Sequence, residues 1–201
     1  QDSRLFLLII AVLTAISSNF GVSNLPKLRA LALSWISLWR FCYTFCMKIG
    51  IFDTGTGGEL VAKRLKELLP QHSYIMAIDR EHAPYGNRSP EEIIALTNAA
   101  IQPLLSCDII ILACNTATTN ALKQLQQLYP DVRFIGFEPM IKSAAASTRS
   151  HRINLLATNA TKQSQRLRTL ISDYASDIRI DAPDTRAWAR MIDQGLAGDI
   201  A

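Results

Sequence analysis

The sequence predicts an α/β fold built on parallel strands. Short apolar runs alternate with amphipathic helical patterns from residue 47 onward, which is typical of βαβ units with helices on both faces of a sheet. One of the runs, from Cys107 to Ala113, is apolar enough for a strand that is buried on both faces. Of the 201 residues, 49% are hydrophobic and 19% are charged, so the chain has enough apolar residues to build a packed core.

Each element follows from this alternation. The apolar runs predict strands at 48–52, 74–79, 108–113, 133–137, 153–157 and 178–180. The helical patterns occupy 58–69, 90–105, 117–129, 140–149, 161–174 and 185–195. Functional groups of such sheets gather where the parallel strands end. The residues at these positions are Asp53, Asp79, Cys114, Glu138 and Thr158.

The chain divides into three segments by composition. Residues 1–46 are strongly apolar, residues 47–139 form a first α/β lobe, and residues 140–201 form part of a second lobe. Glu138-Pro139 is the expected crossover between the lobes, because proline and the residue before it resist continuing a strand or a helix.

Two interpretations of residues 1–46 stay open. The run from Leu5 to Ile16 has 12 residues, interrupted only by Thr14, and this length suits a signal-peptide core better than a membrane span. The segment is therefore either a leader or anchor, or translated upstream sequence with Met47 as the natural start. The many residues between the apolar run and Met47 favour the second interpretation.

Charge and cysteine content exclude several classes of function. The first 46 residues hold four of the 21 basic residues and one of the 17 acidic residues, so the remainder is nearly neutral. It has no basic cluster, which argues against nucleic acid as a partner. The four cysteines are too few for a disulfide scaffold and indicate reduced thiols in the cytoplasm. Without a C-x-x-C or H-E-x-x-H pattern, no metal site is expected.

Three short motifs follow predicted strands. Asp53–Gly58 combines three glycines with a helix start, where backbone N–H groups can meet an anion, although a tight turn explains the glycines equally well. It matches neither nucleotide-binding fingerprint. Ala83–Asn87 precedes a predicted helix and is typical of an ordinary turn. In the third motif, Ala113–Thr118, Cys114 lies at the start of a predicted helix. This position lowers the pKa of a thiol, so Cys114 could act as a base or a nucleophile. The alternative is that Cys114 is simply a small buried hydrophobic residue.

Together these motifs resemble the aspartate/glutamate racemase superfamily, and within it the glutamate racemases. Five pieces occur in the family's order and at its spacing, and they cover Met47 to about Thr161. They are Gly50–Gly58, Ala83–Glu91, Leu112–Thr118, Ile135–Pro139 and Leu156–Thr161. The resemblance implies two doubly wound parallel-sheet lobes, of which the second is incomplete here.

The resemblance also implies an activity and a site. Members of the family interconvert L- and D-glutamate without cofactor or metal, which supplies D-glutamate for peptidoglycan, and two thiols on opposite faces of the substrate act as acid and base. Cys114 would be one of these thiols. The implied substrate-binding residues are Asp53, Thr54 (where the family usually has Ser), Pro84, Tyr85, Gly86, Asn115 and Thr116. Oligomers are common in the family, so a homodimer is one expectation.

The sequence departs from the family pattern after Cys114. The second catalytic cysteine of the family lies in a Gly-Cys-Thr-His motif, and no cysteine follows Cys114 here. We therefore expect a fragment that carries one face of the active site. A non-catalytic module that binds an amino acid and a relative of aspartate racemase remain alternatives. A membrane partner is expected only if residues 1–46 are a real anchor.

Overall fold

The computed structural model describes residues 46–188 and 191. The expected leader, residues 1–46, therefore lies outside the described residues except for Cys46. Four parallel strands form the larger sheet in the order β2-β1-β3-β4. These strands are β1 (Lys48–Asp53), β2 (Ser73–Ile78), β3 (Ile109–Leu112) and β4 (Arg133–Gly136). The predicted α/β class with parallel strands is confirmed.

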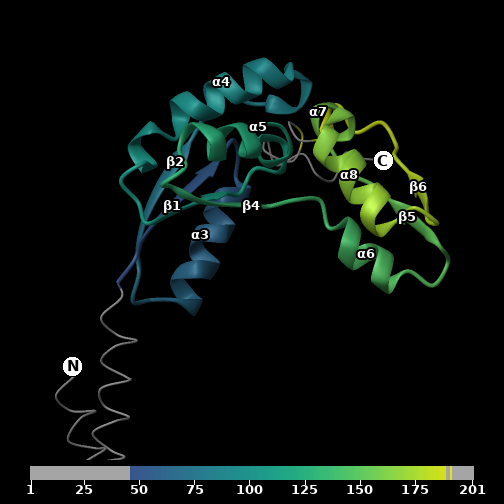
Figure 1. Cartoon of the computed structure of the whole chain (residues 1–201), viewed down its shortest axis with the longest axis horizontal. Coiled ribbons are helices and arrows are strands. Elements are labelled where there is room, and N and C mark those ends of the chain that lie inside the picture. Colours follow the sequence, from purple (N-terminus) through teal and green to yellow (C-terminus); the bar gives the residue numbers. More distant parts are fainter. Residues whose placement is uncertain (1–45, 189–190, 192–201) are drawn as a thin grey trace, which may run out of the picture. The chain divides into compact units, whose positions relative to one another are not determined.

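Helices cover both faces of this sheet (Figure 1). Alternate residues of β1 point to opposite faces, as strand geometry requires. Ile49 and Ile51 pack with Ala62 of α3 (Gly57–Leu68), whereas Phe52 packs on the other face with residues of α4 (Pro90–Ala100) and α5 (Asn115–Leu128). The two apolar clusters fix α3 below the sheet and α4 and α5 above it in the view of Figure 1.

The parallel register brings the carboxyl ends of the strands to one edge. Phe52 of β1 is paired with Leu112 of β3, which is in turn paired with Gly136 of β4. The pairing extends one residue past β3 and β4, because the Ala113 amide donates to the Phe52 carbonyl at 2.8 Å and the Phe137 amide donates to the Leu112 carbonyl at 3.0 Å. The residues that follow these strands are therefore held side by side by backbone hydrogen bonds.

A second sheet has two described strands, the parallel pair β5 (Arg152–Asn154) and β6 (Arg179–Asp181). Its apolar cluster joins Ile141 of α6 (Ile141–Ser147), Leu155, and Leu167 and Leu170 of α8 (Gln165–Tyr174). Between β5 and α8 lies the short helix α7 (Asn159–Gln163). The proposed division into lobes at 139/140 stays a prediction.

Several predicted boundaries differ from the structure. The helix expected over 161–174 is two helices, because Ser164 is extended (φ −65°, ψ 143°) and its hydroxyl accepts the Leu167 N–H as the N-cap of α8. The helix expected over 90–105 ends at Ala100, and a 3-10 turn, η2 (Gln102–Leu104), follows, where Pro103 has no N–H for the helix. The helix expected over 185–195 lies mostly outside the described residues.

Within the part of the chain that the structure describes, no helix is both long enough and apolar enough to cross a membrane.

Candidate functional site

Cys114 lies between the end of β3 and the first turn of α5. It is the N-cap residue of α5, and its sulfur accepts the Ala117 N–H at 3.5 Å. The Thr54 hydroxyl, which follows β1, lies 3.4 Å from the same sulfur. Only 8% of Cys114 is exposed to solvent. The neighbouring ends of β1 and β3 thus bring a hydroxyl and a thiol into contact across 60 residues of sequence.

The pKa of Cys114 is raised, not lowered as its place at a helix start predicted. Burial is the largest cause, because it disfavours the charged thiolate. The carboxylate of Asp53 raises the pKa further, whereas hydrogen bonds from Thr54 and from backbone N–H groups act to lower it. The thiolate of Cys114 is therefore scarce at neutral pH, and for the same reason it is a strong base.

Asp53 is held at the first turn of α3. Its carboxylate oxygen Oδ2 accepts the Gly58 N–H at 2.6 Å and the Gly55 N–H at 3.3 Å, and only 6% of the residue is exposed. A Cβ at Gly58 would lie 2.5 Å from the Cβ of Asp53. The glycines of this segment thus let the backbone come close to a buried carboxylate, which combines the anion-binding and the tight-turn interpretations of the motif.

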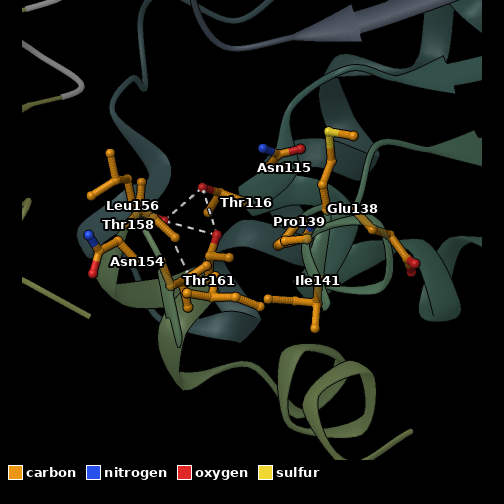
Figure 2. Close-up of a pocket in the computed structure, with 14 residues that line it drawn as sticks. Asn115, Thr116, Glu138, Pro139, Ile141, Asn154, Leu156, Thr158 and Thr161 are labelled. Carbon is orange, nitrogen blue, oxygen red and sulfur yellow. Dashed lines mark hydrogen bonds between the residues drawn. The ribbon is translucent and has the colours of Figure 1, made fainter. Parts of the chain in front are cut away.

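Three threonine hydroxyls meet at the first turn of α5, and we call Thr116, Thr158 and Thr161 the hydroxyl cluster. The Thr116 and Thr158 oxygens are 2.9 Å apart, the Thr158 hydroxyl donates to Thr161 at 3.0 Å, and the Thr161 hydroxyl donates to Thr116 at 3.3 Å. Figure 2 shows the triangle of hydrogen bonds between them. Thr116 comes from α5, and the other two come from the N-cap and first turn of α7.

A cavity of about 490 Å³ opens beside the hydroxyl cluster. Its walls come from the start of α5, the segment after β4, helix α6 and the segment from β5 to α7 (Figure 2). Of the residues predicted for the site, Asn115 and Thr116 belong to its lining. The other six, which are outside this lining, are Asp53, Thr54, Pro84, Tyr85, Gly86 and Cys114.

Pro84, Tyr85 and Gly86 lie at the start of η1 (Tyr85–Asn87), and a cis peptide bond joins Ala83 to Pro84. Tyr85 is 1% exposed, and its ring packs at 6.3 Å between centroids from that of Phe52 in β1. A Cβ at Gly86 would lie only 2.6 Å from the Cβ of Thr158. The predicted turn thus contacts the hydroxyl cluster directly.

Sequence reasoning noticed Thr158 as a strand-end residue but did not assign it or Thr161 to the site. The available signal was the Thr158-x-x-Thr161 spacing, which lets the first hydroxyl accept the N–H of the second as an N-cap (3.3 Å). Glu138, the other strand-end residue at this cavity, forms a two-point ion pair with Arg166 of α8, with 2.9 Å between Nη2 and Oε2. In Figure 2 its carboxylate points away from the hydroxyl cluster.

Within residues 46–188 and 191, no group of three or more His, Cys, Asp or Glu side chains lies close enough together to hold a metal ion.

The fold and site define a class of parallel α/β protein with a buried thiol where two neighbouring strands end. The model of the Asp/Glu/Hydantoin racemase family matches residues 58–198. The chain belongs to this family.

Relatives in the family are named glutamate racemases. One from Ectopseudomonas mendocina is 39% identical over 134 residues, which cover 66% of this chain and 51% of the relative. One from Pseudomonas aeruginosa is 36% identical over 154 residues, covering 76% of this chain and 57% of the relative. The chain thus spans about half the length of the curated relatives it matches.

Solved structures of glutamate racemases share the fold. The Escherichia coli enzyme, in complex with L-glutamate and the activator UDP-MurNAc-Ala, matches with a TM-score of 0.64 and 30% identity, covering 72% of this chain and 55% of that one. The Francisella tularensis enzyme, in complex with D-glutamate, matches with a TM-score of 0.64 and 25% identity, covering 75% of this chain and 57% of that one.

Proposed function

We propose that this chain carries one half of the acid–base centre of a glutamate racemase, with Cys114 as one of two catalytic thiols. The contact of 3.4 Å between the Thr54 hydroxyl and the Cys114 sulfur supports this proposal most directly, because it places a hydrogen-bond partner on the thiol at the edge where the strands end. The names of the relatives, and the glutamate bound in two of the matching structures, indicate the substrate.

The reaction needs a base on one face of the substrate and an acid on the other. The Cys114 thiolate takes the proton from Cα, which leaves the electron pair of the C–H bond on the substrate and makes Cys114 a neutral thiol. A proton donor on the opposite face then gives its proton to Cα, which inverts the centre. The raised pKa of Cys114 has two opposing effects on this step. It makes the thiolate a stronger base toward a weakly acidic C–H bond, but it leaves less thiolate at neutral pH, whereas a general base works best with a pKa near the working pH.

The neighbours of Cys114 fit the charges of an amino acid. We assign Asp53 to binding the substrate ammonium group. The negative charge of Asp53 disfavours the Cys114 thiolate, and the positive charge of a bound ammonium group would offset that effect. Asn115 and Thr116 would bind a carboxylate, and the hydroxyl cluster adds Thr158 and Thr161 to that role because hydroxyls donate hydrogen bonds to anions. Pro84, Tyr85 and Gly86 would form a wall of the substrate site.

Half of the proposed reaction needs a group that is not among these residues. No cysteine follows Cys114 in this sequence, and Cys107 lies at the opposite end of β3, so the described site supplies one thiol of the proposed pair. Neither a metal nor a cofactor enters the proposed steps. The product, D-glutamate, would be a precursor of peptidoglycan. The reaction would take place in the cytoplasm, where the thiols stay reduced.

Deuterium exchange at Cα of glutamate tests the proposal. The chain is incubated in D2O with L-glutamate and, separately, with D-glutamate, and exchange and inversion are measured by NMR and chiral chromatography. We expect Cys114→Ala to lower exchange at least about 100-fold, since a positioned acid or base contributes that much. Cys107→Ala is the matched control, because Cys107 is also a buried cysteine but lies at the opposite end of β3 from Cys114. It packs against Gly50, where an added Cβ would lie 3.2 Å from the Cys107 sulfur.

The outcomes separate the candidate functions. Exchange without inversion indicates a one-sided centre, and exchange with inversion indicates that a second acid acts in this chain. Binding of glutamate without exchange favours the alternative of a non-catalytic amino-acid-binding module, which the scarcity of the Cys114 thiolate supports. Exchange of aspartate in preference to glutamate indicates a relative of aspartate racemase. If Cys114→Ala leaves exchange unchanged, the assignment of Cys114 is wrong.

A further inference from the structure

The carboxylate of Asp79 gathers three donors from the loop that follows β2. The Tyr85 hydroxyl donates to its Oδ2 at 2.7 Å, and the His82 backbone N–H donates to its Oδ1 at 3.1 Å. The His82 ring nitrogen Nδ1 lies 2.9 Å from Oδ1 and 3.0 Å from Oδ2. The Asp79 side chain is 9% exposed, against 44% for that of His82. A nearly buried carboxylate thus ties both ends of the loop from residue 79 to residue 85.

The loop is fixed at its far end as well. Arg88 donates from Nε and Nη2 to the His82 carbonyl at 3.0 and 2.8 Å, and its own N–H donates to the Tyr85 carbonyl at 3.1 Å. The ring of Tyr85 is buried against Phe52. The buried Tyr85 side chain thus has one polar group, its hydroxyl, and this hydroxyl donates to Asp79.

Gly86, the residue after Tyr85, connects the position of this loop to Thr158. Gly86 lies so close to Thr158 that an added Cβ would be 2.6 Å from Cβ and 2.7 Å from Cγ2 of that threonine. Thr158 is the N-cap of α7 and a member of the hydroxyl cluster. A shift of Tyr85 would therefore move the surface against which Thr158 packs.

We propose that Asp79 is a positioning residue: through Tyr85 it holds Gly86 against Thr158 and so fixes the hydroxyl cluster from outside the substrate site. Its relevance to glutamate binding rests on the proposed function, whereas its mechanical role does not. Asp79 is not part of the cavity lining, and the path runs from its carboxylate to the Tyr85 hydroxyl, to Gly86 and then to Thr158.

Hydrogen–deuterium exchange of the backbone amides tests this path without any ligand. Two variants of the full chain are used: Asp79→Asn, which removes the charge, and Tyr85→Phe, which removes only the hydroxyl. Mass spectrometry follows segments 80–88 and 157–163. We expect amide exchange to become about two- to tenfold faster in both segments, because this is the factor that corresponds to the loss of one hydrogen bond. The second variant keeps the test decisive if Asp79→Asn does not fold.

Asp108→Asn is the matched control. Asp108 also accepts a backbone N–H, that of Lys48 at 2.7 Å, but at the edge of the sheet where the strands begin. It should leave segment 157–163 unchanged. Faster exchange confined to segment 80–88 would overturn the proposal, because the loop would then be loosened without any effect on Thr158. Equal loosening of 157–163 by Asp108→Asn would also overturn it, since the effect would then be general.

A second readout separates this inference from the proposed function. The dissociation constant for L-glutamate, measured by titration calorimetry, should rise about two- to tenfold in Asp79→Asn and Tyr85→Phe and stay unchanged in Asp108→Asn. If the unaltered chain binds no glutamate, the proposed function fails, yet the exchange experiment still decides whether Asp79 positions Thr158. If glutamate binds with equal affinity to all variants, the relevance of Asp79 to glutamate binding is overturned and the proposed function stands.

Discussion

The Thr54 hydroxyl and the Cys114 sulfur lie 3.4 Å apart, although they follow different strands of the sheet. Burial and the charge of Asp53 disfavour the thiolate, whereas the bonds from Thr54 and the Ala117 N–H favour it. The pKa of Cys114 is therefore a balance of opposing causes, and single substitutions should move it in opposite directions.

Replacing Thr54 by Val should raise the pKa of Cys114, because the thiolate loses a hydrogen-bond donor. At a pH below that pKa, alkylation of Cys114 by iodoacetamide should slow about two- to tenfold, as expected for one hydrogen bond of about 0.5–1.5 kcal/mol. Asp53→Asn should lower the pKa and speed alkylation, since it removes a nearby negative charge. Rates are measured against pH on the Cys114 peptide by mass spectrometry.

Cys107 serves as the internal reference for the alkylation rates, which are measured on its own peptide in the same samples. It is buried like Cys114, and its pKa is also raised mainly by burial, but its charged neighbours are Lys48 and Asp108. Its rate should not respond to either substitution. Shifts in the same direction for Thr54→Val and Asp53→Asn would contradict the assigned balance.

Local signals were sufficient for most of the fold. The apolar runs of β1 and β3 predicted parallel strands, because burial of a strand leaves a pattern in neighbouring residues. Ser164 shows where such a signal is weak. A serine inside a helical pattern is compatible with continuing the helix, and only the capping bond to Leu167 decides that it ends one helix and begins another.

The site was less accessible to sequence reasoning because it depends on distant contacts. Asn115 and Thr116 were expected from the family resemblance, but the hydrogen bond between Thr116 and Thr158 spans 42 residues of sequence and left no local trace. The predicted shift of the Cys114 pKa was wrong in direction for the same reason. A helix start can be read from the sequence, whereas the degree of burial is set by the surrounding elements.

Gly57 and Gly58 form a matched pair for testing the close approach of α3 to Asp53. In Gly58→Ala the new Cβ would lie 2.5 Å from the Asp53 Cβ, so the helix start must move, and we expect a loss of about 1–3 kcal/mol in the free energy of unfolding. In Gly57→Ala the nearest atom is Asp53 Oδ2 at 3.4 Å, an ordinary contact. That variant should be neutral or more stable by up to about 1 kcal/mol. Urea denaturation measures both; equal effects would contradict the role of Gly58.

The carboxylate of Asp79 should make stability depend on acid pH. Burial acts to raise its pKa, but the hydrogen bonds from Tyr85 and His82 outweigh burial, and the pKa is lowered. In the unfolded chain the value is about 3.9. A pKa lowered by folding stabilises the protein above the unfolded value, and this stability is lost as pH falls through the folded value.

The difference in unfolding free energy between the unaltered chain and Asp79→Asn should therefore be largest above about pH 5 and shrink below about pH 4. Urea denaturation across this range provides the measurement. Tyr85→Phe keeps the carboxylate but removes one of its donors, so its pH dependence should lie between the other two. A difference that is independent of pH would show that Asp79 contributes through its shape and not through its charge.

The break between α7 and α8 should depend on the Ser164 hydroxyl. It accepts the Leu167 N–H at 3.2 Å and donates to the Thr161 carbonyl at 2.8 Å, and Ser164 is 5% exposed. Ser164→Ala leaves both backbone groups without this partner, so we expect a loss of about 0.5–2 kcal/mol in unfolding free energy. Thr169→Ala is the control on α8, because its hydroxyl only bonds back to the Gln165 carbonyl, at 3.2 Å. If both variants lose the same stability in urea denaturation, Ser164 acts as an ordinary helix residue, and the division into two helices has another cause.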